Sequence, residues 1–147
     1  MHNGARVASW DLPAEVRAAA QARVLTRETL LDWGVTDPSD TDEVVLMIDE
    51  LVTNAVVHGH GPVRLLLRLD GAQLVGEVGD DSTGAPRVRE SGLEAEAGRG
   101  LWLVAALAAE FGVRPEIVGK TLWFTRPLAP RDDPNGGFDS GFEGARA

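Results

Sequence analysis

Glu50 and Asn54 are the two residues of this sequence whose types and spacing are best suited to chemistry. The segment from Glu50 to Gly59 has the pattern of a helix interior, and a spacing of four places the carboxylate and the carboxamide on one helix face. Such a pair can hold a divalent ion and a water, and a nucleoside triphosphate arrives with such an ion. An ordinary solvated helix face would show the same pair, so other segments have to decide between the two. Apolar residues cover the other side of the predicted helix (Val44, Ile48, Leu51, Val52 and Ala55).

Two further segments have residue types that suit a bound nucleotide. Asp80-Asp81-Ser82-Thr83-Gly84 directly follows a predicted strand, and Gly98-Arg99-Gly100 directly precedes a predicted helix. A carboxylate at a strand end can accept a hydrogen bond from the exocyclic amino group of a buried base. Glycines at a helix start let backbone N–H groups approach phosphates, where the helix dipole also favours anions. Each segment alone also fits a plain turn.

The two standard phosphate-binding motifs are absent. Gly119-Lys120-Thr121 resembles the end of a P-loop, but Arg114 stands where that pattern requires glycine, and the segment lies between predicted strands. The Gly98-x-Gly100 pattern lacks a third glycine and has no parallel βαβ context. We interpret Lys120, the only lysine of the chain, as a hairpin residue.

Hydrophobic periodicity predicts the elements that position these segments. Residues 6–12 form an edge strand or an extended lead-in, and Pro13 opens a helix that ends near Gly34. Residues 37–40 form a turn and an N-cap for the helix that carries Glu50. The remaining predictions are strands at 63–69, 73–78, 113–118 and 121–126, a long loop at 79–100 and a helix at 100–111. This order predicts an α+β two-layer sandwich with a mixed, antiparallel-rich sheet and helices on one face.

Composition limits the class of protein. The 147 residues suit one domain, and a net charge of −9 argues against nucleic-acid binding, which needs a basic patch. No apolar run is long enough for a transmembrane helix, and the first residues lack a signal core. The absence of cysteine excludes disulfides and zinc–thiolate sites, and fits a cytoplasmic location. The predicted organisation is a lead-in at 1–9, a domain at 10–126 and a disordered tail at 127–147.

The three segments in this order resemble the N, G1 and G2 boxes of the GHKL ATPase superfamily, whose ATP-binding domain has the Bergerat fold. The resemblance covers about residues 10–126. Asp49-Glu50-Leu51-Val52-Thr53-Asn54-Ala55 followed by His58-Gly59, together with Gly98-Arg99-Gly100-Leu101, is most similar to the branch of anti-sigma factor serine/threonine kinases.

The resemblance implies a role for each matching position. Asn54 matches the ligand of a Mg²⁺ ion that bridges the ATP phosphates, and Glu50 matches the catalytic base that activates a serine hydroxyl. Asp80 matches the aspartate that binds the adenine amino group, and Asp81 fits that register less well. The other matches are Gly84 in the second box (where Ser82 replaces the first glycine), Gly98 and Gly100 as phosphate-contacting glycines with Arg99 between them, and Thr121 near adenine. Thr121 fits a plain strand residue equally well.

The resemblance implies a Mg-ATP-dependent kinase that phosphorylates an anti-sigma factor antagonist and binds a sigma factor, and that can form a homodimer. A non-catalytic, ATP-gated protein-binding module has the same ligand residues and remains open. A sensor histidine kinase is disfavoured, because no helix pair with a phosphoacceptor histidine and no membrane segment precedes the domain. A fold that binds no nucleotide is the remaining alternative.

Overall fold

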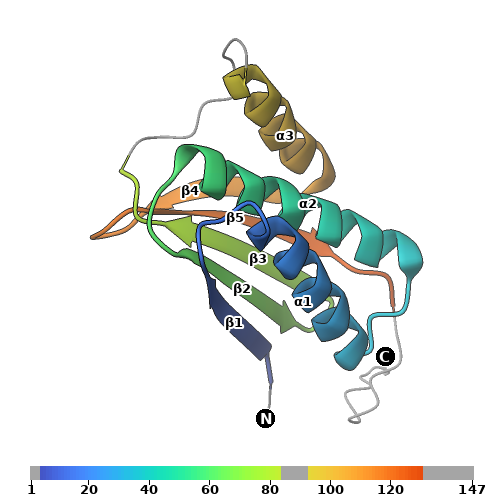
Figure 1. The fold of residues 1–147 in the computed structure, drawn as a ribbon. Coiled ribbons are helices and arrows are strands. Elements are labelled where there is room, and N and C mark those ends of the chain that lie inside the picture. Colours follow the sequence, from blue (N-terminus) through green and yellow to red (C-terminus); the bar gives the residue numbers. More distant parts are fainter. Residues whose placement is uncertain (1–3, 84–92, 131–147) are drawn as a thin grey trace.

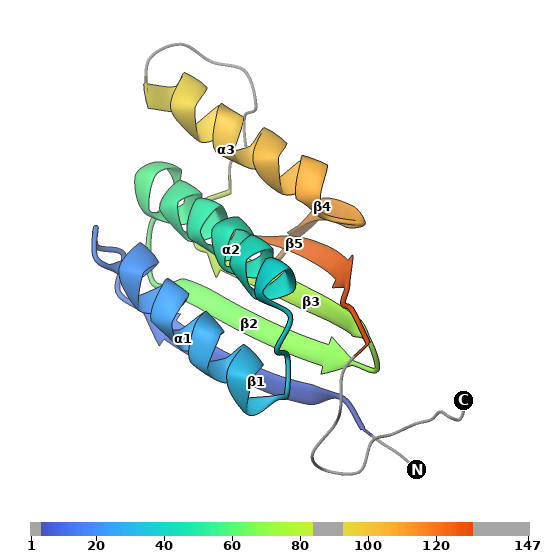
Figure 2. The same ribbon diagram turned by 90° about the vertical axis from the view of Figure 1, so that its right-hand side faces the viewer.

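The structure, a computed structural model, describes residues 4–83 and 93–130, and for residues 93–99 the backbone alone. Three helices pack on one face of a five-stranded sheet (Figures 1 and 2). The elements in chain order are β1 (Arg6–Leu12), α1 (Ala18–Asp32), α2 (Pro38–His58), β2 (Val63–Asp70), β3 (Gln73–Asp80), α3 (Leu93–Leu107), β4 (Glu110–Pro115) and β5 (Lys120–Pro127). The predicted two-layer α+β sandwich is therefore confirmed.

The sheet has the strand order β1-β2-β3-β5-β4, and every neighbouring pair is antiparallel. The predicted antiparallel character thus extends to all five strands. The β2–β3 hairpin turns at Asp70-Gly71 as predicted, because Gly71 adopts the positive φ of 64° that such a turn needs. β1 is an edge strand. The open face of the sheet, opposite the helices, has no helix over it in the described part of the chain (Figure 2).

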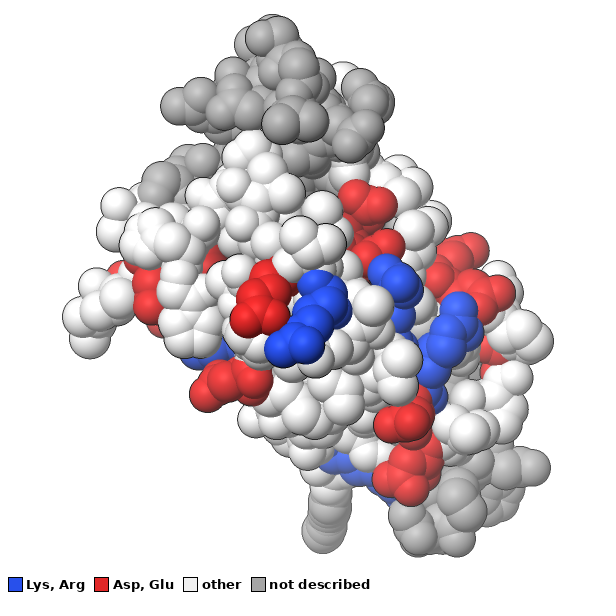
Figure 3. Space-filling view, viewed as in Figure 1, with Lys and Arg blue, Asp and Glu red and all other residues white. Residues whose placement is uncertain are grey.

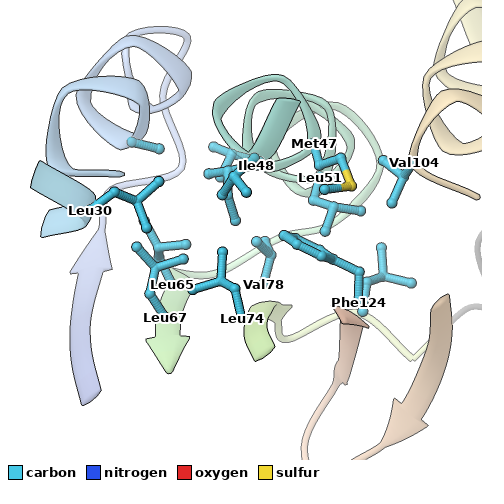
Figure 4. Packing of buried hydrophobic residues seen from close by; sticks show 14 of the residues in the cluster. Leu30, Met47, Ile48, Leu51, Leu65, Leu67, Leu74, Val78, Val104 and Phe124 are labelled. Carbon is cyan, nitrogen blue, oxygen red and sulfur yellow. The ribbon is translucent and has the colours of Figure 1, made fainter. Parts of the chain in front are cut away.

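The core lies between α2 and the sheet. Ile48 and Leu51 of α2 point toward Phe124 of β5, and all three are fully buried (Figure 4). Gly76 of β3 makes room for this packing, because a Cβ there would overlap the Phe124 ring. Each such side chain contributes about 1.5–3 kcal/mol to folding through burial, which fixes α2 across the sheet.

Two aspartates hold the N-terminal end of α2 in place. Asp37 caps the helix by accepting a hydrogen bond from the Asp40 N–H at 3.0 Å, as the sequence predicted. Asp40 itself is buried and ties the end of β5 to this helix: it accepts from Arg126 Nη2 at 3.1 Å and from the Ala129 N–H at 2.7 Å. Packed structure therefore continues beyond Pro127, where the sequence predicted the tail to begin, and residues 131–147 lie outside the described ranges.

Three helix boundaries differ from the predictions. One is the end of α3, which lies at Leu107 because β4 already begins at Glu110, inside the predicted helix. α1 begins at Ala18 and not at Pro13, because residues 13–17 form turns with short-range bonds such as Ala18 N–H to Glu15 O at 2.9 Å. α3 begins at Leu93, inside the predicted loop. The five residues from Leu93 to Ala97 are all strong helix formers, and their propensity outweighs the polar, glycine-rich composition that predicted a loop.

Charge on the helical face is mixed in sign. Acidic and basic side chains alternate over α1 and α2 (Figure 3), and ion pairs such as Arg23–Asp49 at 3.0 Å and Arg27–Asp42 at 3.1 Å join the two helices. Within residues 4–83 and 93–130, no helix combines the length and apolar character that a membrane span requires.

Candidate functional site

α2 brings Glu50 and Asn54 to the end of the helix that lies over the ends of β3 and β5. Asn54 is buried and Glu50 is half-buried, so neither belongs to a solvated helix face. Gly100 of α3 packs directly on Glu50, because a Cβ at this position would overlap the Glu50 carboxylate oxygen Oε1. Glycine at this position allows the close contact between the backbone of α3 and the end of the Glu50 side chain. The structure thus brings together two of the three predicted segments.

Asp80, the last residue of β3, is buried with 2% of its surface exposed. Its carboxylate oxygen Oδ1 accepts a hydrogen bond from the Ser82 N–H at 2.7 Å, which fixes the side chain over the start of the next segment. Gly59, at the C-terminal end of α2, lies against the same carboxylate, and a Cβ there would come within 2.6 Å of Oδ2. The end of α2 and the end of β3 thus meet at the Asp80 carboxylate.

Lys120 completes this group, which sequence reasoning did not foresee. Its ammonium Nζ lies 3.0 Å from Asp80 Oδ2 and donates to Ser82 Oγ at 2.6 Å. The side chains of Lys120 and Asp80 are 7% and 3% exposed. The pairing of β3 with β5 places the two residues opposite one another. The sequence indicated only the β4–β5 hairpin, and the one usable signal was a lone lysine at the start of a strand.

Thr121 does not join this group. Neighbouring residues of a strand point to opposite faces of a sheet, so Lys120 points to the helices and Thr121 to the open face. There its hydroxyl donates to Glu116 Oε2 at 2.9 Å. The residue that lies opposite Asp80 is Lys120 and not Thr121.

The segment after β3 is anchored to the connection between α2 and β2. The Asp81 N–H donates to His60 O at 2.8 Å, and the Asp81 carboxylate accepts from Arg64 Nη1 at 2.9 Å. Gly61 lies against Asp81 with a φ of 78° and has no room for a Cβ. These contacts explain why the carboxylate of Asp81 faces Arg64, while that of Asp80 faces Lys120.

The remaining predicted residues lie in or beside α3. Gly84 lies outside the described residues. Gly98 and Arg99 lie within α3 and not before it, since the helix begins at Leu93. Inside a helix, the N–H groups bond to carbonyls four residues earlier, and only the first four are free. The predicted phosphate-binding N–H groups are therefore engaged in the helix in this structure.

The open face carries a separate group of charges. Arg114 of β4 donates to Glu77 at 2.9 Å and to Glu116 at 3.0 Å. Hydrogen bonds from Thr121 first and Arg114 second hold the pKa of Glu116 below its ordinary value, and the bonds to Glu77 and Glu116 raise the pKa of Arg114. Among the described residues, no cluster of three His, Cys, Asp or Glu side chains is arranged to hold a metal ion by itself.

The comparison that decides the family is a match of residues 12–126 to the model of the histidine kinase-like ATPase domain. The chain belongs to this family. The match spans α2, Asp80 and Gly100, so the group of residues described above lies in an ATPase domain, and ATP is the cofactor that the family implies. The buried Asp80 carboxylate fits this cofactor chemically, since it is an acceptor of the kind that the amino group of a purine base needs.

Two solved structures are similar to this chain, one over most of its length and one over part of it. The crystal structure of the RsbU and RsbW domains of Rv1364c from Mycobacterium tuberculosis is 26% identical, with a TM-score of 0.67, over 87% of this chain. This chain spans about a third of that one, which is covered to 34%. The histidine kinase domain of a blue-light activated histidine kinase from Erythrobacter litoralis EL346 matches with 28% identity and a TM-score of 0.45, covering 60% of this chain and 44% of that one. No curated protein matches the sequence.

Proposed function

We propose that this chain is an ATP-binding regulatory protein that binds Mg-ATP and phosphorylates a serine of a partner protein, in the manner of anti-sigma factor serine/threonine kinases. The observation that carries the proposal is the placement of Glu50 and Asn54, side by side on α2, within a histidine kinase-like ATPase domain. The likeness to the structure that contains an RsbW domain supports this branch of the family. The partner in this proposal is an anti-sigma factor antagonist.

Each residue of the site has a proposed role. The amide oxygen of Asn54 is a ligand for Mg²⁺, an ion that keeps several waters and takes only one or two ligands from a protein. Glu50 accepts the proton of the attacking serine hydroxyl. Bound Mg-ATP supplies the phosphoryl group, and positioning and electrostatics account for most of the catalysis.

Asp80 accepts a hydrogen bond from the amino group of adenine. The residues that contact the phosphates are Gly84, Gly98, Arg99 and Gly100. For the N–H groups of Gly98 and Gly100 to reach phosphates, the helix must begin near residue 97, so its first turn has to unwind. That Thr121 contacts the nucleotide stays a prediction, and the position of its hydroxyl on the open face argues against it.

The test is the transfer of labelled phosphate from Mg-ATP to a serine-bearing antagonist protein. Glu50→Gln and Glu50→Ala should abolish transfer and leave ATP binding intact. Binding is measured separately by thermal shift, since ligand at a hundredfold excess over its Kd stabilises the fold by about 2.7 kcal/mol. Asp42→Ala is the matched control, because it removes an acidic side chain of the same helix that pairs only with Arg27 at the surface. Phosphate transfer that persists in both variants would contradict the assignment of Glu50 as the catalytic base.

One contact favours a second function, a non-catalytic module that ATP switches between partners. Gly100 packs on the Glu50 carboxylate, so nucleotide that binds beside Glu50 would change the contact between α2 and α3. α3 carries Trp102, a side chain that is 58% exposed and suits a protein interface. In this case ATP would change partner capture in the wild type and in Glu50→Gln alike, with no phosphate transferred in either.

A further inference from the structure

Lys120 contacts the carboxylate of Asp80, which the proposed function assigns to the binding of adenine. Its ammonium contacts Asp80 Oδ2 at 3.0 Å and Oδ1 at 3.3 Å, and its third donor reaches Ser82 Oγ at 2.6 Å. All three donors of the ammonium are therefore used within one buried group. Among the described residues, Lys120 is the cation that contacts the Asp80 carboxylate, since Arg64 Nη2 donates to the Asp80 backbone carbonyl at 3.1 Å and Nη1 to Asp81.

This arrangement fixes the carboxylate in charge and in direction. A buried carboxylate needs a paired cation to remain charged at low cost, and Lys120 supplies it from the strand opposite. A carboxylate offers about four acceptor positions. The Ser82 N–H and Lys120 use those of Oδ1, whereas Oδ2 accepts from Lys120 alone among the hydrogen bonds of the described residues and keeps an acceptor position. A purine amino group needs such an acceptor, held still.

We propose that Lys120 is a positioning residue of the nucleotide site, which makes the preference for a 6-amino purine depend on the Lys120–Asp80–Ser82 group. The inference rests on the proposed ATP site. Lys120 acts through Asp80: it pairs with the carboxylate and orients it, so that the carboxylate accepts a hydrogen bond from the amino group. Without the ammonium, the Ser82 N–H is the one remaining partner of the carboxylate among the hydrogen bonds of the described residues. Oδ2 is then no longer held, and the amino group no longer adds to affinity.

The experiment compares the Kd values of two Mg-nucleotides, ATP and purine riboside triphosphate, which lacks only the amino group. The full chain is titrated by calorimetry. The wild type should bind ATP at least about tenfold more tightly, which is the usual worth of a charged hydrogen bond. Lys120→Met should bring the ratio of the two Kd values close to one, chiefly by weakening ATP. Lys120→Arg keeps the positive charge and should retain most of the ATP preference.

Ser82→Ala is the milder variant for the case in which Lys120→Met does not fold. It removes the hydroxyl that anchors the ammonium and leaves both charges in place, so it should lower the ATP preference by about threefold. Arg64→Gln, at the neighbouring cation that contacts only the backbone of Asp80, is the matched control and should leave the preference unchanged.

The outcomes separate this inference from the proposed function. If the wild type binds neither nucleotide, the ATP site and the inference both fail. If the wild type prefers ATP and the preference survives in Lys120→Met, or in Ser82→Ala where only that variant folds, the inference alone is overturned. An equal loss of affinity for both nucleotides in Lys120→Met would show a purely structural role and would also overturn it.

Discussion

The two faces of the sheet differ in how they hold charged side chains near the same strand ends: one face buries them and the other leaves them exposed. On the helical side, Asp80 and Lys120 form one buried ion pair, 3.0 Å apart. On the open face, the residues next to them in sequence, Gly79 and Thr121, adjoin a network in which Arg114, 48% exposed in its side chain, bridges Glu77 and Glu116. The difference follows from strand alternation, which directs one residue to a covered layer and its neighbour to solvent.

The covered pair and the solvated network should differ in what their loss costs. A buried ion pair adds little net stability compared with apolar packing, but the removal of one partner leaves an uncompensated charge and is costly. An exposed pair is weakened by water and salt, and contributes about 0–1 kcal/mol. The buried group therefore specifies one arrangement of the strand ends, whereas the open network tolerates change.

The largest difference between the two faces is expected when the basic side chain is removed from each of them in turn. Lys120→Ala leaves the Asp80 carboxylate buried without its partner, and we expect the free energy of unfolding to fall by about 3–5 kcal/mol. Arg114→Ala, the matched change on the open face, should lower it by no more than about 1 kcal/mol. Urea denaturation of the two variants measures both values, and similar losses would contradict the distinction between the faces.

A smaller effect is expected from the turn that brings Lys120 to Asp80. Gly119 has a φ of 85°, and a Cβ there would overlap the backbone carbonyl oxygen of Asp80. Gly119→Ala should therefore cost about 2 kcal/mol or more, from the backbone conformation and the overlap together. Gly71→Ala is the control, because Gly71 has a φ of 64° with nothing within 4 Å of a Cβ, so only about 1 kcal/mol is expected. Thermal unfolding of the pair should rank them in this order.

The smallest effect sharpens the description of the open face. Thr121→Val removes the hydroxyl that contributes most to the lowered pKa of Glu116, so this pKa should rise toward its ordinary value of 4.5. A carboxylate with a lowered pKa in the folded state contributes stability above about pH 4.5, and this is lost as the pH falls through the folded pKa. The variant should lose part of that contribution. An NMR titration of Glu116 measures the shift, with Thr125→Val, on the same face, as the control that should leave it unchanged.

Much of the fold could be predicted because local signals agreed with the global packing. The apolar stripe of α2, its cap at Asp37 and the turn at Asp70-Gly71 each specify one element, and all were found as predicted. The start of α3 was wrong because glycine and charge suggested a loop, while helix propensity over Leu93–Ala97 prevailed. Local composition alone cannot weigh these two effects.

The site was harder to predict because it depends on pairing between distant strands. Glu50 and Asn54 share a helix, and their placement on one face follows from helical spacing. The partner of Asp80 lies forty residues away and is set by the register of β3 with β5, which the sequence does not show. The resemblance pointed to Thr121, whereas strand alternation directs Lys120, and not Thr121, to the face that the helices cover.

The tie between Asp40, Arg126 and the Ala129 N–H also has a practical consequence for handling the protein. It holds the chain that leaves β5 at the first turn of α2, whereas Glu50, Asn54 and Gly59 lie toward the other end of this 21-residue helix. A helix of that length spans about 30 Å. A tether attached after Pro130 would therefore hold the molecule with its candidate site facing the solution, which suits surface-based measurements of nucleotide and partner binding.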